Sequence, residues 1–250
     1  MGFAGRPNAE ELGRLGIGSL SAKGAEIEKQ ARPYAAGRKI LPVFELIATV
    51  AHGSPGPDKM YRGRSGDAMI RTHLAAARKA KGILLLDIQP GRADFLTEVR
   101  AYERWLREPD VGVALDPEWA MKLTGGVPGK RYGKTTGAEL DKVAAYLSGL
   151  VKTHNLPEKV MVFHQVAASV VTGESALRDH PGVVSIKSVD GIGSPGMKRD
   201  TWRALTQNLA PHVKTGFKLF YREDTEGSWP LMTPKQVLAL KPTPDYVMYE

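Results

Sequence analysis

Eight runs of apolar residues, each about as long as a β-strand, are spread along the chain. Within most of them the apolar positions are almost continuous instead of alternating with polar ones. Such runs are typical of strands buried on both faces, as in a parallel sheet covered by helices. The predicted strands are Gly2–Gly5, Leu41–Ala51, Gly82–Gln89, Val111–Trp119, Lys159–Val166, Gly182–Asp190, Thr215–Tyr221 and Asp245–Glu250.

Segments with helical spacing lie between these runs. The clearest is Ala93–Arg107, whose apolar residues fall on one face. Thr136 and Glu139 predict a capping box, in which each side chain accepts a hydrogen bond from a free backbone N–H at the start of a helix. Further helices are expected at Ala9–Leu15, Ala25–Tyr34, Ser65–Ala80, Ala168–Asp179, Lys198–Leu209 and Pro234–Leu240.

Strands and helices therefore alternate through the whole sequence. Eight such units in 250 residues match the size of a (β/α)₈ barrel of the TIM type, and an eight-stranded doubly wound open sheet is the competing arrangement. No linker or change of composition divides the chain, so we expect residues 1–250 to be one domain. The last strand is predicted to end at Glu250 without an eighth helix.

Composition excludes several classes of protein. No apolar run approaches the length of roughly 18 to 20 residues that a membrane-spanning helix needs. The chain has no cysteine, which excludes disulfide scaffolds, thiolate zinc sites and cysteine nucleophiles. The formal charge of +8 favours anionic partners in general, including an anionic cell envelope, but no specific nucleic-acid site is expected, since the one dense basic cluster is Lys130, Arg131 and Lys134.

The N-terminus lacks the basic and apolar regions of a signal peptide. Because the chain begins almost directly with a predicted strand, we expect an extracellular or cell-envelope protein whose export signal has been removed, with a cytoplasmic location left open. A monomer is expected. The expected setting is that of a secreted bacterial enzyme acting at the cell wall.

In parallel barrels, chemistry takes place at the carboxyl ends of the strands and in the loops that follow them. Asp116 and Glu118 are the strongest candidates there, because side chains two apart on a strand point to the same side. Repulsion and partial burial would raise one pKa, so that a protonated acid and an ionised carboxylate coexist, as glycoside hydrolysis requires.

The stretch from Asp110 to Trp119, DVGVALDPEW, resembles the fourth-strand motif of glycoside hydrolase family 18, the chitinase-like barrels, and the D-x-E motif of family 25 lysozymes. The resemblance implies that Glu118 is the general acid and that Asp116 orients it or stabilises the developing positive charge. The sequence departs from the chitinase pattern at Ala114, where that family has a further acid.

Asp87 is the candidate facing carboxylate on the preceding strand. Its separation from Glu118 would decide the stereochemistry, since roughly 5 to 5.5 Å implies retention and roughly 6.5 to 9.5 Å implies inversion. Glu45 lies inside an apolar run and needs a buried partner, for which Lys187 and Lys218 are candidates. The residues expected to contact substrate are Glu45, Gln89, Trp119, His164, Gln165, Lys187, Asp190, Tyr221 and Glu250.

No cofactor or metal is expected, although His164 with Asp87 and Asp116 could hold a metal. The glycine motifs near Gly133 and Gly191 lack the spacing or context of nucleotide sites. The sequence thus favours a glycosidase acting on a carbohydrate polymer. Two alternatives stay open, an aldolase-like lyase with Lys187 as Schiff-base nucleophile and a non-catalytic glycan-binding barrel.

Overall fold

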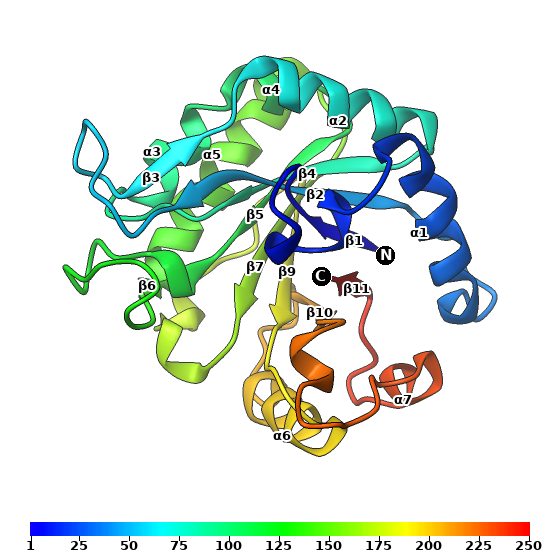
Figure 1. Cartoon of the computed structure of the whole chain (residues 1–250). Coiled ribbons are helices and arrows are strands. Elements are labelled where there is room, and N and C mark those ends of the chain that lie inside the picture. The colour runs from blue at the N-terminus through cyan, green and yellow to red at the C-terminus, as the bar shows by residue number, and fades with distance from the viewer.

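Eight parallel strands form a closed barrel in the computed structural model, which describes residues 1–250 (Figure 1). The first strand pairs with both the second and the last, which closes the ring and places the two ends of the chain side by side (Figure 1). In order around the barrel the strands are β1 (Gly2–Gly5), β2 (Val43–Ala51), β4 (Ile83–Ile88), β5 (Val111–Leu115), β7 (Lys159–Gln165), β9 (Val183–Val189), β10 (Lys214–Leu219) and β11 (Tyr246–Tyr249).

All eight predicted strands are confirmed, and the closed ring rules out the open sheet. The largest difference in length is at β5, which stops at Leu115 because Pro117 has no backbone N–H for the ladder and begins a 3₁₀ turn. A short strand that was not predicted, β3 (Arg62–Arg64), pairs antiparallel with β2. The strand was not predicted because its three residues, Arg-Gly-Arg, form no apolar run.

Strict alternation along the strands separates two apolar layers. Every second side chain points into the barrel and the others pack under the helices. The inner layer is a cluster of eight buried residues, Ala4, Val43, Leu85, Ala114, Val162, Ile186, Tyr246 and Met248, whereas the layer between barrel and helices contains 44. Continuous apolar runs are thus explained by burial on both faces.

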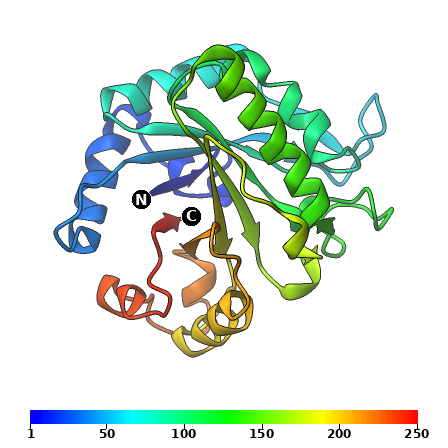
Figure 2. The same cartoon turned by 180° about the vertical axis from the view of Figure 1, so that it is seen from behind.

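Helices cover the outside of the barrel, as the view from behind shows (Figure 2). None of them is long and apolar enough to cross a bilayer. The α-helices are α1 (Lys23–Ala31), α2 (Asp67–Lys79), α3 (Phe95–Arg100), α4 (Glu103–Leu106), α5 (Gly137–His154), α6 (Pro195–Thr206) and α7 (Pro234–Leu238). Single 3₁₀ turns lie at Glu10–Leu12, Arg14–Gly16, Leu20–Ala22, Arg32–Tyr34, Pro117–Trp119, Ala168–Val170, Glu174–Ala176 and Glu223–Thr225.

Two predicted helices are wrong. Ala9–Leu15 contains only 3₁₀ turns, because Gly13 interrupts it at a φ of 113°, a conformation that helices do not contain. Ala168–Asp179 contains two 3₁₀ turns around the short strand β8 (Val171–Thr172), which pairs with β6 (Thr135–Thr136). The β-branched residues of this segment favour the extended pairing over a helix.

The predicted helix Ala93–Arg107 is divided into α3 and α4. The break falls at Tyr102, whose hydroxyl donates to the backbone oxygen of Ala48 (2.8 Å) on β2 and so pulls the chain toward the barrel. The predicted capping box is half confirmed. Thr136 accepts from the backbone N–H of Glu139 (3.1 Å), but the Glu139 carboxylate instead accepts from the N–H of Phe95 (3.0 Å) at the start of α3.

Candidate active site

Polar side chains gather inside the barrel, most of them at the carboxyl ends of its strands, with Glu45 and Tyr246 deeper in the interior. They occupy the inward positions that continue the alternation of the inner apolar layer, and nearly all of them are buried. Most of them are predicted site residues, which come from six strands. Ser188, Lys218 and Tyr246 were not predicted to belong to the site. Its members are Glu45, Asp87, Gln89, Asp116, His164, Ser188, Asp190, Lys218, Tyr246 and Glu250.

His164 stands between two acids in this interior. Its Nδ1 lies 2.7 Å from Oδ2 of Asp190, and its Nε2 lies 3.3 Å from Oε1 of Glu45. Neither ring nitrogen has a hydrogen-bond partner, so the two contacts are ion pairs without a well-aligned hydrogen bond. Burial alone would lower the pKa of His164, but Asp190 and Glu45 outweigh it and raise that pKa well above its ordinary value. The two acids therefore favour the imidazolium form of the ring.

The same pairing sets the charge of both neighbouring acids. Burial would raise the pKa of Asp190, but His164 and Lys218 lower it to about 2. Burial likewise opposes ionisation of Glu45, yet His164 and Lys218 hold its pKa below the usual value, and the Tyr246 hydroxyl donates to its Oε2 (2.5 Å). The buried partners of Glu45 are thus His164 and Tyr246, and not Lys187 as one alternative had it.

Lys218 supplies the second cation of the interior. Its Nζ lies 2.6 Å from Oε2 of Glu250 and 3.5 Å from Oδ2 of Asp190. Burial disfavours the charged amine, but Glu250 and Asp190 raise the pKa of Lys218 well above its ordinary range. These acids favour the protonated amine, and the protonated form of a lysine is not a nucleophile.

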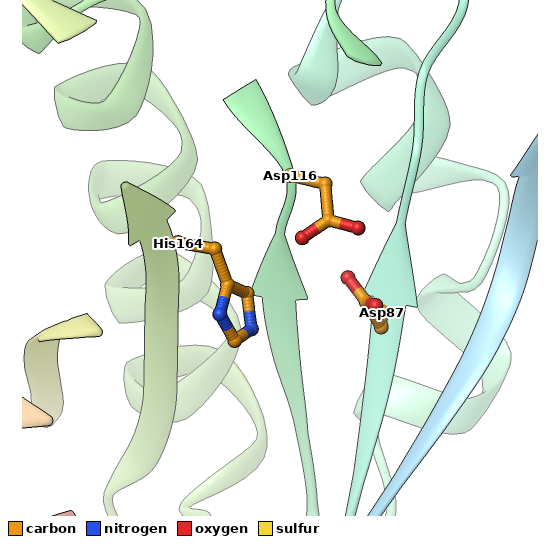
Figure 3. A group of neighbouring side chains, drawn as sticks. All are labelled: Asp87, Asp116 and His164. Atoms are coloured by element: carbon orange, nitrogen blue, oxygen red, sulfur yellow. The ribbon is translucent and has the colours of Figure 1, made fainter. Parts of the chain in front are cut away.

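Asp87, Asp116 and His164 lie side by side at the ends of the neighbouring strands β4, β5 and β7 (Figure 3). One donor atom from each lies within 4.8 Å of the other two. The Nε2 of Gln89 donates to Oδ2 of Asp116 (3.2 Å), whereas Oδ1 of Asp87 and Oδ1 of Asp116 are buried without any partner. Burial raises the pKa of both carboxyls, and the charge of Asp116 raises that of Asp87 further, well above its normal value. Protonation of the pair is therefore favoured, and the charge of Asp116 favours Asp87 as the protonated member.

A metal could be held by these three side chains only through a neutral imidazole. The acids on either side of His164 favour the protonated ring instead. The positive charge in this part of the barrel is therefore supplied by His164 itself. A metal bound by these three side chains would have to displace the proton of His164.

Glu118 lies just outside the strand, on the 3₁₀ turn Pro117–Trp119. Its direction is set by this turn and not by strand alternation, which differs from the prediction for Asp116 and Glu118. Glu118 is half-buried, and its Oε2 is buried without a hydrogen-bond partner. Burial, followed by the charges of Asp116 and Asp190, raises the pKa of Glu118 well above its ordinary value. The surroundings of Glu118 therefore favour its protonated form.

A surface pocket of about 420 Å³ opens beside this acid. Its wall combines two aromatic side chains with two cationic ones. The lining residues are Glu118, Trp119, Gly129, Lys130, Arg131 and Tyr132. Trp119 lines this pocket together with the candidate acid, and its contact with substrate stays a prediction.

Three predicted contact residues lie elsewhere. Lys187 points out of the barrel, where its Nζ donates to Glu174 (2.7 Å) and to the backbone oxygen of Leu205 (2.6 Å). Gln165 follows His164 and, by alternation, lies on the outer face of β7. Tyr221 stacks on Tyr249 with ring centroids 5.2 Å apart, in the outer layer. The lyase hypothesis loses its nucleophile, since Lys187 does not reach the mouth.

Sequence reasoning did not assign Tyr246, Ser188 and the loop that carries Lys130 and Arg131 to the site. Tyr246 and Ser188 occupy inward positions of their strands, and counting alternate residues back from Glu250 and Asp190 would have found them. The Ser188 hydroxyl donates to Oδ1 of Asp190 (2.8 Å). The cluster of basic residues on the loop was visible in the sequence, but no local sequence pattern showed that Lys130 and Arg131 line a pocket with Glu118.

No family model and no curated protein sequence matches the chain. Among solved structures, a GH18 chitinase from Pseudoalteromonas aurantia is similar at 11% sequence identity over 83% of this chain and 85% of that chain, with a TM-score of 0.30. At this level the likeness carries no information about activity. The chemistry of the site follows from its own side chains.

Proposed function

We propose that this protein is a glycoside hydrolase that acts on a polysaccharide or cell-envelope glycan, with Glu118 as the general acid. The observation that carries the proposal is the state of Glu118. It is a carboxylic acid with a raised pKa and an unpartnered oxygen, and it lines a surface pocket with two aromatic residues. A group that must donate a proton near neutral pH needs this combination of protonation and access.

Cleavage would begin with proton transfer from Glu118 to the glycosidic oxygen. The carbon–oxygen bond breaks with its electron pair going to that oxygen, and positive charge develops on the sugar ring. Asp116 is the carboxylate best suited to stabilise this charge, since protonation of the buried pair is favoured at Asp87. Gln89 supports this role by donating to Asp116. Trp119 and Tyr132 offer faces on which a sugar ring can stack.

The network behind Asp116 keeps the charge of the site fixed. His164 and Lys218 are cations paired with Glu45, Asp190 and Glu250, and they are buried with those acids at the mouth. Electrostatic stabilisation is strongest when charges are arranged before the reaction in a site that excludes water. The network therefore supports a positive transition state next to Asp116.

A hydrolysis assay on a panel of polysaccharides tests the proposal. The release of reducing ends is compared for the wild type, Glu118→Gln and a control, Glu28→Gln, on the exposed face of α1. On the glycan that the wild type cleaves, Glu118→Gln should lose about 10²–10⁴-fold in turnover, because size is kept and the transferable proton is removed. The control should keep full activity.

Two results would contradict the proposal. If no glycan is cleaved while some are bound, the protein is the non-catalytic glycan-binding barrel instead. If a glycan with a poor leaving group is cleaved at the wild-type rate by Glu118→Gln, the acid is another residue.

A further inference from the structure

The loop between β5 and α5 forms the outer wall of the pocket beside Glu118. Backbone hydrogen bonds fasten it near its C-terminal end, from Gly133 to the oxygen of Glu118 (2.6 Å) and from Lys134 to the oxygen of Ala120 (2.8 Å). Arg92 fastens its middle, donating to the backbone oxygens of Gly125 and Gly126 (both 3.2 Å). The side chains on this loop are therefore presented to the pocket from a fixed backbone.

Arg131 is held within this loop in a defined orientation. Its Nη2 donates to the backbone oxygen of Thr124 (2.5 Å), and its guanidinium lies against Gly126. A Cβ at position 126 would lie 2.7 Å from Nε of Arg131, so a larger residue there would push the guanidinium out of this position. Since a guanidinium has five N–H donors, most remain available for a ligand.

The charge of the pocket differs in sign from that of the barrel interior. Its lining contains two cations, Lys130 and Arg131, and one carboxyl, Glu118, whose pKa is raised. The interior behind it holds more acids than cations. An anionic group is therefore attracted to the pocket wall and repelled from the mouth.

We propose that the sugar bound in this pocket carries a carboxylate, sulfate or phosphate group, which Arg131 and Lys130 bind while the neutral part of the glycan reaches Glu118. The proposal rests on the function proposed above and names its substrate class. The planar fork of Arg131 suits the oxygen atoms of any of these anions. Binding them would orient the glycan with its anionic group toward the loop.

Binding of matched glycans to Glu118→Gln, which cannot turn them over, tests this inference. The probes are tetragalacturonate and its methyl ester, sulfated and unsulfated chitotetraose, and phosphorylated and unphosphorylated oligomannose, measured by calorimetry at near-physiological salt. At least one anionic probe should bind about tenfold more tightly than its neutral counterpart. The three arms show which anion the pocket takes.

Variants then locate the preference. All variants are made in the Glu118→Gln background. The double substitution Lys130→Gln/Arg131→Gln should abolish the preference for the anionic probe. The double substitution Lys142→Gln/Lys152→Gln removes the same charge from the exposed face of α5 and should keep the preference. Gly126→Ala should weaken it although both cations remain, because the new methyl displaces Arg131.

The inference is overturned if no anionic probe is preferred, if none binds, or if the preference survives in the Lys130/Arg131 variant. Failure of the proposed function has a different signature. In that case the anionic preference persists in binding, while the wild type cleaves none of the glycans that it binds.

Discussion

The imidazole of His164 and the carboxylate of Asp190 meet at 2.7 Å inside the barrel, on neighbouring strands and out of contact with water. Each holds the other in its charged form against the cost of burial. Removing one partner leaves the other as a buried, uncompensated charge, which is strongly destabilising. Stability should therefore depend on this pair and on pH.

Asp190→Asn should lower the free energy of unfolding by about 3–5 kcal/mol, because it leaves the His164 imidazolium with only Glu45 beside it. Urea denaturation followed by circular dichroism measures the loss. Asp200→Asn, a change to an exposed acid on α6 that pairs with Arg203, is the matched control and should have little effect. Equal stability of the two variants would contradict the importance of the pair.

The pH dependence of unfolding should show the same pair. The pKa of Asp190 is depressed to about 2 in the folded protein, so its contribution is complete above about 4 and is lost as pH falls toward 2. The pKa of His164 is raised, so its contribution is complete below about 6.5 and is lost as pH rises through its folded pKa. Thermal unfolding across this range should show both losses, and Asp190→Asn should flatten both. Unchanged slopes in that variant would assign the pH dependence to other groups.

Asp116→Asn should move the alkaline limb of the rate profile to lower pH. After burial, the charge of Asp116 is the largest contribution that raises the pKa of Glu118, and removing it makes Glu118 easier to deprotonate. The profile of kcat/KM against pH on the best glycan measures the shift. Asp58→Asn, on the exposed β2–β3 loop, should leave the limb in place. If the alkaline limb of the profile stays at the same pH in Asp116→Asn, the limb reflects the ionisation of a group other than Glu118.

Divalent cations should not stabilise the protein. Binding at Asp87, Asp116 and His164 needs a neutral imidazole, and the acids beside His164 favour the protonated ring. The melting temperature with Zn²⁺, Mn²⁺ or Mg²⁺ is expected to equal that with EDTA. A rise that disappears in His164→Gln would instead establish a metal site.

Glu139→Ala should destabilise the fold by about 1–2 kcal/mol, since the N–H of Phe95 and the hydroxyl of Thr135 both lose their acceptor. Glu28→Ala makes the same change on the exposed face of α1 and controls for helix propensity. Urea denaturation compares the two. If they are equally stable, Glu139 contributes no more than an exposed helical glutamate.

The sequence was sufficient for the eight buried strands and for the acids at the ends of several of them, whereas closure into a barrel was decided by the pairing of β1 with β11. Strands buried on both faces are apolar almost throughout, so the runs were visible without any knowledge of their partners. Because alternate residues of a strand share a side, Asp87 and Asp116 could be placed at one rim from their positions after apolar runs. Both deductions depend on local patterns alone.

The partners of these residues were decided only by the tertiary structure. Glu45 pairs with Tyr246, 201 residues away, and Glu139 caps the start of α3 instead of its own helix. Lys187 and Lys218 are each the fifth residue of their strand, yet one points outward to Glu174 and the other inward to Glu250. The register between the two strands decides this, because Lys187 lies opposite Thr215, three residues before Lys218. Charge, protonation and access at the site follow from contacts between strands that only barrel closure brings together, and no short-range pattern encodes those contacts.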